Sequence, residues 1–129
     1  MYYLLHFNLA PPKFSTKDLK DTLTLNLGAS TAIEFPFTAN PQPKVTWTYN
    51  DEKLPDPKRF KTTTITRMTS LTMAKVVLKD AGDYKVTLEN ENGSATYTVK
   101  VIVLGEQISV KLLLFLAYLT IVLLQLPLS

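Results

Sequence analysis

The 129-residue sequence contains no cysteine and only one histidine, His6. Without cysteine the chain can form no disulfide, no CxxC metal site and no thiol nucleophile. His6 belongs to the apolar segment 1–10, outside the part predicted to fold, whereas Ser-His-Asp catalysis needs a base held in position. Because disulfides persist in oxidising compartments, the lack of cysteine also favours a reducing one.

The sequence also has no large excess of either charge, since 14 basic and 11 acidic residues give a net charge of +3. This excess is too weak to predict a nucleic-acid partner. A small basic cluster is formed by Lys58, Arg59, Lys61 and Arg67. It is interpreted as a solvated face, because it lacks the series of aromatic side chains on which bases stack. There is no glycine-rich phosphate loop and no constellation of metal ligands, so we expect no cofactor, metal or small-molecule substrate.

Short segments of alternating apolar and polar residues dominate the region 11–104. Alternation with period two is typical of half-buried strands, and Pro11-Pro12 excludes a helix at the start of the region. Turn residues separate the segments, which give seven or eight strands at a spacing typical of an immunoglobulin-like β-sandwich. The alternating segments cover residues 22–27, 32–37, 44–49, 59–67, 70–78, 82–89 and 95–103.

The sequence KDAGDYKVTLENENG, residues 79–93, carries the most specific pattern. In an immunoglobulin sandwich, a tyrosine two residues before the second cysteine position forms the tyrosine corner. Tyr84 is predicted to be this corner, and Val86 stands where the cysteine would be. Asn92-Gly93 predicts a two-residue type I′ hairpin turn. The same residues begin an Asn-Gly-Ser glycosylation sequon, which the turn is expected to explain without glycosylation.

As a set, these motifs resemble an I-set immunoglobulin domain. The resemblance covers residues 11–104 and is closest to modules of the titin and twitchin group of giant muscle proteins. It implies that Phe35 and Val86 occupy the two cysteine positions, and that Asp80 pairs with Arg59. The matching motifs are Pro41-x-Pro43-x-Val45-x-Trp47, Leu71-x-Met73, Asp80-x-Gly82-x-Tyr84 and Asn90-x-x-Gly93.

Apolar packing is expected to replace the missing disulfide. A disulfide stabilises a domain by about 2–4 kcal/mol, and burial of one large apolar side chain contributes roughly 1.5–3 kcal/mol. Phe35, Trp47 and Val86 are therefore predicted to fill the space between the sheets.

The C-terminal segment differs from the rest of the chain. Residues 108–128 are almost entirely apolar, and the 17 residues 112–128 are at the short end of what spans a bilayer. The segment is interpreted either as a membrane anchor or as a non-native extension. We therefore expect an N-terminal extension (1–10), an I-set domain (11–104) and a hydrophobic, helical tail (105–129).

The functional prediction is a non-catalytic structural and protein-binding immunoglobulin module in the cytoplasm. The resemblance implies sarcomeric or cytoskeletal proteins as partners. The alternative is a small adhesion or receptor-like protein anchored in the membrane through residues 108–128. No residue of the sequence supports an enzyme.

Overall fold

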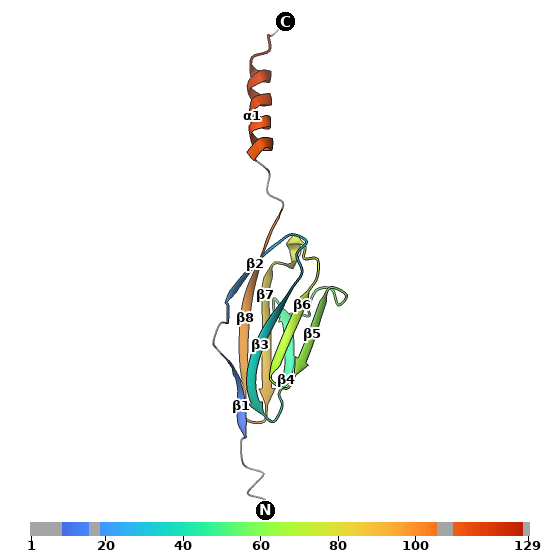
Figure 1. The fold of residues 1–129 in the computed structure, drawn as a ribbon, viewed down its shortest axis with the longest axis vertical. Helices are drawn as coiled ribbons and strands as arrows, with labels where there is room; N and C mark the ends of the chain where they lie inside the picture. The colour runs from blue at the N-terminus through green and yellow to red at the C-terminus, as the bar shows by residue number, and fades with distance from the viewer. Residues whose placement is uncertain (1–8, 16–18, 106–109, 128–129) are drawn as a thin grey trace, which may run out of the picture.

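The alternating segments fold into eight strands within the part of the chain that the structure, a computed structural model, describes: residues 9–15, 19–105 and 110–127. His6 and the rest of residues 1–8 lie outside it. The strands are β1 (Ala10–Phe14), β2 (Thr22–Asn26), β3 (Thr31–Asn40), β4 (Lys44–Tyr49), β5 (Phe60–Ile65), β6 (Met68–Met73), β7 (Gly82–Asn90) and β8 (Gly93–Leu104), with a 3-10 helix η2 (Leu78–Asp80) and a helix α1 (Val110–Leu124) (Figure 1).

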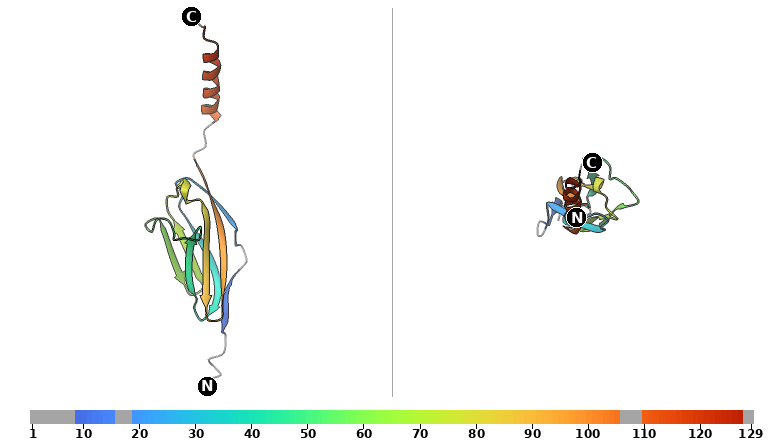
Figure 2. Two further views of the ribbon diagram at one scale, coloured as in Figure 1. Left: turned by 180° about the vertical axis from the view of Figure 1, so that it is seen from behind. Right: turned by 90° about the horizontal axis from the view of Figure 1, so that it is seen from above.

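Two four-stranded sheets face each other, in the orders β1-β3-β6-β5 and β2-β8-β7-β4. The sandwich is visible from both sides in Figures 1 and 2. All strand pairs are antiparallel except β2 and β8, which run parallel. The first part of the chain therefore contributes a strand to each sheet, because β1 pairs with β3 in one sheet and β2 pairs with β8 in the other. This architecture confirms the predicted all-β immunoglobulin-like sandwich.

The core lies between the sheets, where the predicted alternation places one face of each strand. In β7, the side chains of Tyr84, Val86 and Leu88 are completely buried, while Asp83 and Glu89, which flank them, are exposed. The other buried apolar residues include Phe14, Phe35, Phe37, Trp47, Phe60, Leu71, Met73, Val76, Val99 and Val101. The alternation of apolar and polar residues in the sequence thus correctly predicts which side chains of β7 are buried in the core.

Several strand boundaries differ from the prediction. The predicted segments 59–67 and 70–78 correspond to β5 and β6, which form a hairpin with its turn at Thr66-Arg67. The hairpin begins one residue later than predicted, at Phe60, and ends five residues earlier, at Met73. After β6 the chain leaves the sheet, and Lys75 adopts a positive φ of 49°. β1 begins at Ala10, one residue before the predicted start of the domain.

Proline within a sheet is usually confined to edge strands, strand starts or bulges, but Pro36 lies in β3, an inner strand between β1 and β6. Its missing N–H is tolerated because the pairing changes there. Pro36 is the last residue of β3 paired with β6, whereas the pairing with β1 covers Phe37 to Asn40.

The predicted type I′ turn at Asn92-Gly93 is wrong. Asn90 pairs with Gly93, so the loop consists of residues 91 and 92, and neither has the positive φ that this turn requires. The Asn90 side chain fixes the loop instead, since its Oδ1 accepts a hydrogen bond from the Asn92 N–H (2.9 Å) and its Nδ2 donates to the Pro41 carbonyl (3.0 Å). Consecutive positive φ values occur at Asn50 (48°) and Asp51 (66°).

The apolar C-terminal segment contains α1, which confirms a helical tail. The helix has 15 residues, none of which is buried. Among the residues described, no helix combines the length and apolar character needed to cross a membrane.

Candidate functional site

The end of the sandwich near η2 gathers the residues predicted as the corner. Tyr84 points inward from β7, and its hydroxyl donates a 2.6 Å hydrogen bond to the backbone carbonyl of Asp80. The Tyr84 ring stacks on Phe60, at 5.9 Å between centroids, and packs against Tyr49 at 5.0 Å. Tyr84 therefore ties η2, which precedes its own strand, to the aromatic side chains of β4 and β5.

Asp80 carries a buried charge that is fully paired. Its carboxylate accepts hydrogen bonds from Arg59 Nη1 (2.7 Å), Arg59 Nη2 (3.0 Å) and the backbone N–H of Val77 (2.8 Å). Burial alone would raise the pKa of Asp80, but the hydrogen bonds from Arg59 and Val77 outweigh it and hold the pKa below its usual value. Asp80 thus remains ionised and joins η2 to the start of β5.

The same contacts affect the other two titratable groups. The hydrogen bond to Asp80 raises the pKa of Arg59 above its ordinary value, and Arg59 Nε also donates to Asp56 at 3.2 Å. Burial raises the pKa of Tyr84, and the negative charge of Asp80 adds to the effect. All three groups are therefore held in the protonation states they have at neutral pH.

Gly82 lies against Tyr49 in this cluster, where there is no room for a side chain. A Cβ at this position would lie 2.7 Å from Tyr49 Cε2 and 2.9 Å from the Asn50 side chain, and the φ of Gly82 is +151°. Tyr49 was not among the predicted site residues, although its hydroxyl lies 2.9 Å from the Lys79 carbonyl and 2.7 Å from that of Ala81. The alternation of β4 could have identified it, because Tyr49 is in phase with Val45 and Trp47.

The remaining predicted residues lie at the centre of the sandwich. Phe35 and Val86 are buried, Trp47 is 8% exposed, and Trp47 pairs with Val86 across β4 and β7. The ring of Phe35, in the opposite sheet, is 5.7 Å from that of Trp47. Apolar volume thus occupies the place of an inter-sheet disulfide.

A polar contact that the sequence did not suggest also joins the sheets. Trp47 Nε1 in β4 donates a 2.9 Å hydrogen bond to Oγ1 of the buried Thr69 in β6. Thr69 Oγ1 in turn lies 3.0 Å from Thr64 Oγ1. A buried indole N–H usually needs such a partner, but no sequence pattern indicates which hydroxyl provides it.

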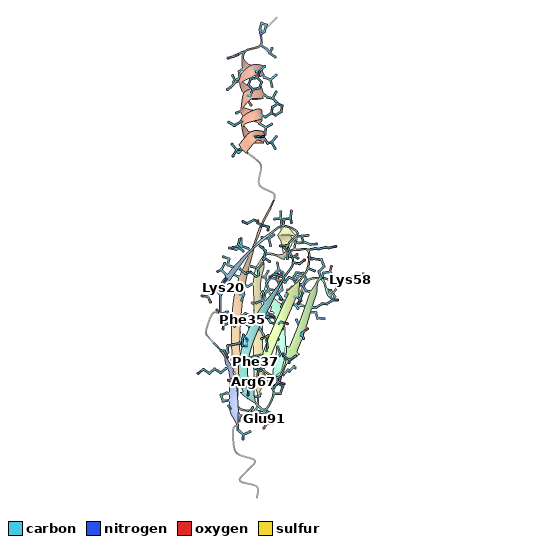
Figure 3. All side chains as sticks on the ribbon, in the orientation of Figure 1. Lys20, Phe35, Phe37, Lys58, Arg67 and Glu91 are labelled. Atoms are coloured by element: carbon cyan, nitrogen blue, oxygen red, sulfur yellow. The ribbon has the colours of Figure 1, made fainter. Side chains whose placement is uncertain are left out.

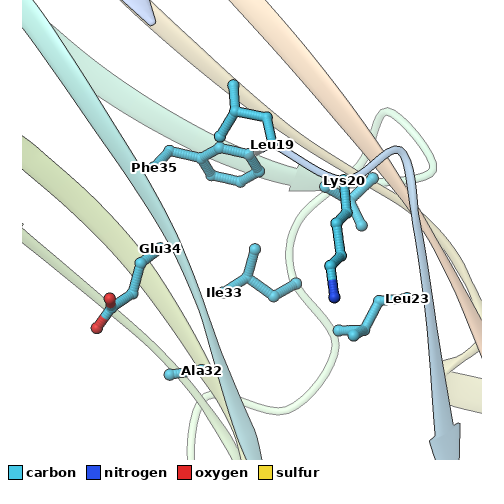
Figure 4. A pocket seen from close by; sticks show the side chains of 8 residues that line it. Leu19, Lys20, Leu23, Ala32, Ile33, Glu34 and Phe35 are labelled. Atoms are coloured by element: carbon cyan, nitrogen blue, oxygen red, sulfur yellow. The ribbon is translucent and has the colours of Figure 1, made fainter. Parts of the chain in front are cut away.

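One shallow groove opens beside the core, between β2 and β3, with a volume of about 230 Å³. Figure 4 shows apolar side chains facing it, among them Leu19, Leu23 and Ile33, while the Glu34 carboxylate points away. Lys20 is the other charged side chain along it. Within the described residues, no group of three or more potential ligands is arranged to hold a metal ion.

The two sheets, the tyrosine corner and the central tryptophan define an immunoglobulin-like sandwich. Residues 12–103 match the sequence profile described as the Immunoglobulin I-set domain. The chain therefore belongs to the I-set immunoglobulin family, as the motifs predicted.

Curated relatives extend the comparison. The chain is 34% identical over 96 residues to the smooth muscle myosin light chain kinase of Gallus gallus, a match over 74% of this chain and 5% of the kinase. It is 27% identical over 110 residues to human myosin-binding protein H, covering 82% and 23%. The chain thus spans a small part of these relatives, and the activity of the kinase as a whole does not follow from the match.

Solved structures of titin have the same fold. The tandem domains A164-A165 superpose with a TM-score of 0.71 at 25% identity, over 76% of this chain and 51% of that one. The titin domains Z1Z2, solved in complex with telethonin, give a TM-score of 0.68 at 26% identity, over 76% and 49%. The chain is thus an immunoglobulin module similar to those of titin and the myosin-binding proteins, and its relatives do not favour the membrane-anchored alternative.

Proposed function

We propose that the chain is a non-catalytic module that binds other proteins of the sarcomere or cytoskeleton in the cytoplasm. The observation that carries the proposal is the I-set match over residues 12–103, together with relatives named for muscle and myosin. One solved relative, titin Z1Z2, is described as a complex with telethonin, which supports protein binding as the role of such a module.

The chemistry of the corner agrees with a structural role. Asp80 and Arg59 bind each other, and the Tyr84 hydroxyl donates to a backbone carbonyl. A nucleophile or a general base must instead reach a substrate. Arg59, Asp80, Gly82 and Tyr84 therefore hold the end of the sandwich together, and Phe35, Trp47 and Val86 hold the sheets together.

We further propose that residues 11–104 form the immunoglobulin unit and that residues 105–129 lie outside its core. No residue of α1 is buried, and the last strand ends at Leu104.

The distribution of the full chain in striated muscle cells tests the function. A fluorescently tagged chain is expected to show a striated pattern in register with the sarcomere. The variant Trp47→Ala, which should destabilise the fold by roughly 3–5 kcal/mol, serves as the control and should be more diffuse. Accumulation in the secretory pathway or at the plasma membrane, with a glycosidase-sensitive mobility shift lost in Asn92→Gln, would refute the proposal.

A further inference from the structure

β5 is a free edge of the first sheet, because it pairs only with β6. Ala74 donates a 2.9 Å hydrogen bond to the Arg59 carbonyl. In antiparallel pairs, residues alternate between facing the neighbour and facing away. The N–H and C=O groups of Thr62 and Thr64 therefore point away from β6, and they have no hydrogen-bond partner among the residues described.

The unpaired charges on β5 and next to its ends are all positive. Lys58, Lys61 and Arg67 are exposed, and Figure 3 labels Lys58 and Arg67, which lie just before and just after β5. None of the three forms an ion pair with an acidic residue within the described part of the chain, and β5 itself has no acidic residue. Arg59, by contrast, is neutralised by Asp56 and Asp80.

The edge of the other sheet, at β4, has a different charge balance. Tyr49 faces away from β7, since it exchanges hydrogen bonds of 2.8 Å with Glu52, and by the same alternation the backbone groups of Val45 and Trp47 face outward. Beside this edge, Lys85 forms an ion pair with Asp51 at 2.6 Å, and Lys44 is opposite Glu89. The two edges thus offer similar backbone groups in different electrostatic surroundings.

We propose that β5 is a docking edge that accepts an extended, acidic segment of a partner protein as an added strand. The proposal rests on the proposed protein-binding function and specifies the chemistry of the partner. Thr62 and Thr64 would supply main-chain hydrogen bonds, the means by which an added strand gains affinity. Acidic side chains at alternate positions would lie beside Lys61 and Arg67, and an apolar one beside Ile65, which is 61% exposed.

Charge disfavours a second copy of this chain as the occupant. Antiparallel pairing of Thr64 with Thr64 of another copy would bring Lys61 of one copy opposite Arg67 of the other, and neither charge is neutralised within its own copy by the residues described. Like charges placed opposite each other destabilise a strand pair. An acidic segment meets the same edge without this repulsion.

A peptide titration tests the proposal with the full 129-residue chain. The probe is a fluorescein-labelled peptide of sequence Thr-Val-Glu-Val-Glu-Val-Thr, and the control peptide has lysine in place of glutamate. Fluorescence anisotropy should show binding of the acidic peptide, weakened as salt rises from about 0.05 M to 0.5 M, and affinity for the lysine peptide at least about ten-fold lower. Failure of the acidic peptide to bind, or equal binding of both peptides, would overturn the proposal.

Matched variants locate the site. Lys61→Glu with Arg67→Glu should weaken binding of the acidic peptide about ten-fold or more. Lys44→Glu with Lys100→Glu makes the same charge change on the other sheet and should leave the affinity unchanged. Equal loss in both double variants would show a general charge effect and would contradict a site at β5.

Hydrogen exchange in the unmodified chain provides a measurement that does not depend on variants. The acidic peptide should slow exchange of the Thr62 and Thr64 amides and leave those of Val45 and Trp47 unchanged. Protection at β4 instead would overturn the proposal. If the chain forms striations in cells but does not bind the acidic peptide, the proposed acidic partner is refuted and the proposed function stands. If the striated pattern is absent, the proposed function itself is refuted.

Discussion

The substitution Tyr84→Phe removes one hydroxyl from the corner and leaves the aromatic ring in place. The hydroxyl donates a 2.6 Å hydrogen bond to the Asp80 carbonyl in a buried position. Removing it leaves a buried acceptor without this donor, which costs about 1–3 kcal/mol. For a domain of this size, each kcal/mol lowers the melting temperature by roughly 4–8 °C. We therefore expect the melting temperature to fall by at least about 4 °C.

Urea melts of the chain and the variant, followed by Trp47 fluorescence, measure the change. The slope of the unfolding free energy against urea should stay the same while the midpoint falls, because the exposed surface does not change. Tyr97→Phe is the matched control, since its hydroxyl donates to Asp21 at an exposed position. That substitution should change stability by less than about 0.5 kcal/mol.

Alkaline pH gives a second readout of the same hydroxyl. Burial raises the folded-state pKa of Tyr84 above its unfolded value of about 10. The unfolded state therefore loses its proton first, and the contribution of Tyr84 is complete below about pH 10 and declines as pH rises beyond it. Stability should fall more steeply above pH 10 in the unmodified chain than in Tyr84→Phe. An unchanged urea midpoint with identical alkaline slopes would refute the corner.

Three further predictions concern the core, the corner and the domain boundary. Trp47→Ala should cost roughly 3–5 kcal/mol in urea melts, and a smaller loss than Tyr84→Phe would show that Trp47 is not central. Gly82→Ala should destabilise by about 1–3 kcal/mol, because its Cβ would meet Tyr49 at 2.7 Å. Gly28→Ala should cost less, because Gly28 also has a positive φ (+85°) but no heavy atom lies within 4 Å of its Cβ. A larger loss in Gly28→Ala would contradict this geometry. Residues 1–104 alone should form a soluble, folded monomer by circular dichroism and gel filtration, unless residues 105–129 contribute to the core.

The sequence was sufficient to predict the sandwich, because alternation places each inward side chain on its strand. Tyr84, Val86 and Leu88 follow directly from the period of β7. The ends of β5 and β6 were less predictable. Threonine is common in strands, and threonines occur in both strands and in the turn that joins them, so the sequence does not show where each strand stops. Tertiary contacts also decided the turn after β7, where hydrogen bonds of the Asn90 side chain set a loop one residue earlier than Asn92-Gly93 suggests.

The partners of the buried polar groups were only partly predictable. The ion pair of Asp80 and Arg59 was implied by resemblance, since the two residues are distant in sequence and no local pattern joins them. The hydrogen bond from Trp47 to Thr69 had no signal at all, because many threonines alternate with apolar residues in this chain. Which of them reaches the indole depends on how the two sheets are stacked.

The parallel pairing of β2 with β8 has a consequence for the order of folding. It joins Thr22 to Lys100 and Asn26 to Leu104, so it closes a loop that contains nearly the whole domain. Pairing over such a separation gains no contact energy until the intervening strands have met, and we expect it to form after the rate-limiting step. A destabilising change at Leu25, such as Leu25→Ala, should then accelerate unfolding in stopped-flow experiments and leave refolding almost unchanged. Slower refolding would instead place the pairing of β2 with β8 in the folding nucleus.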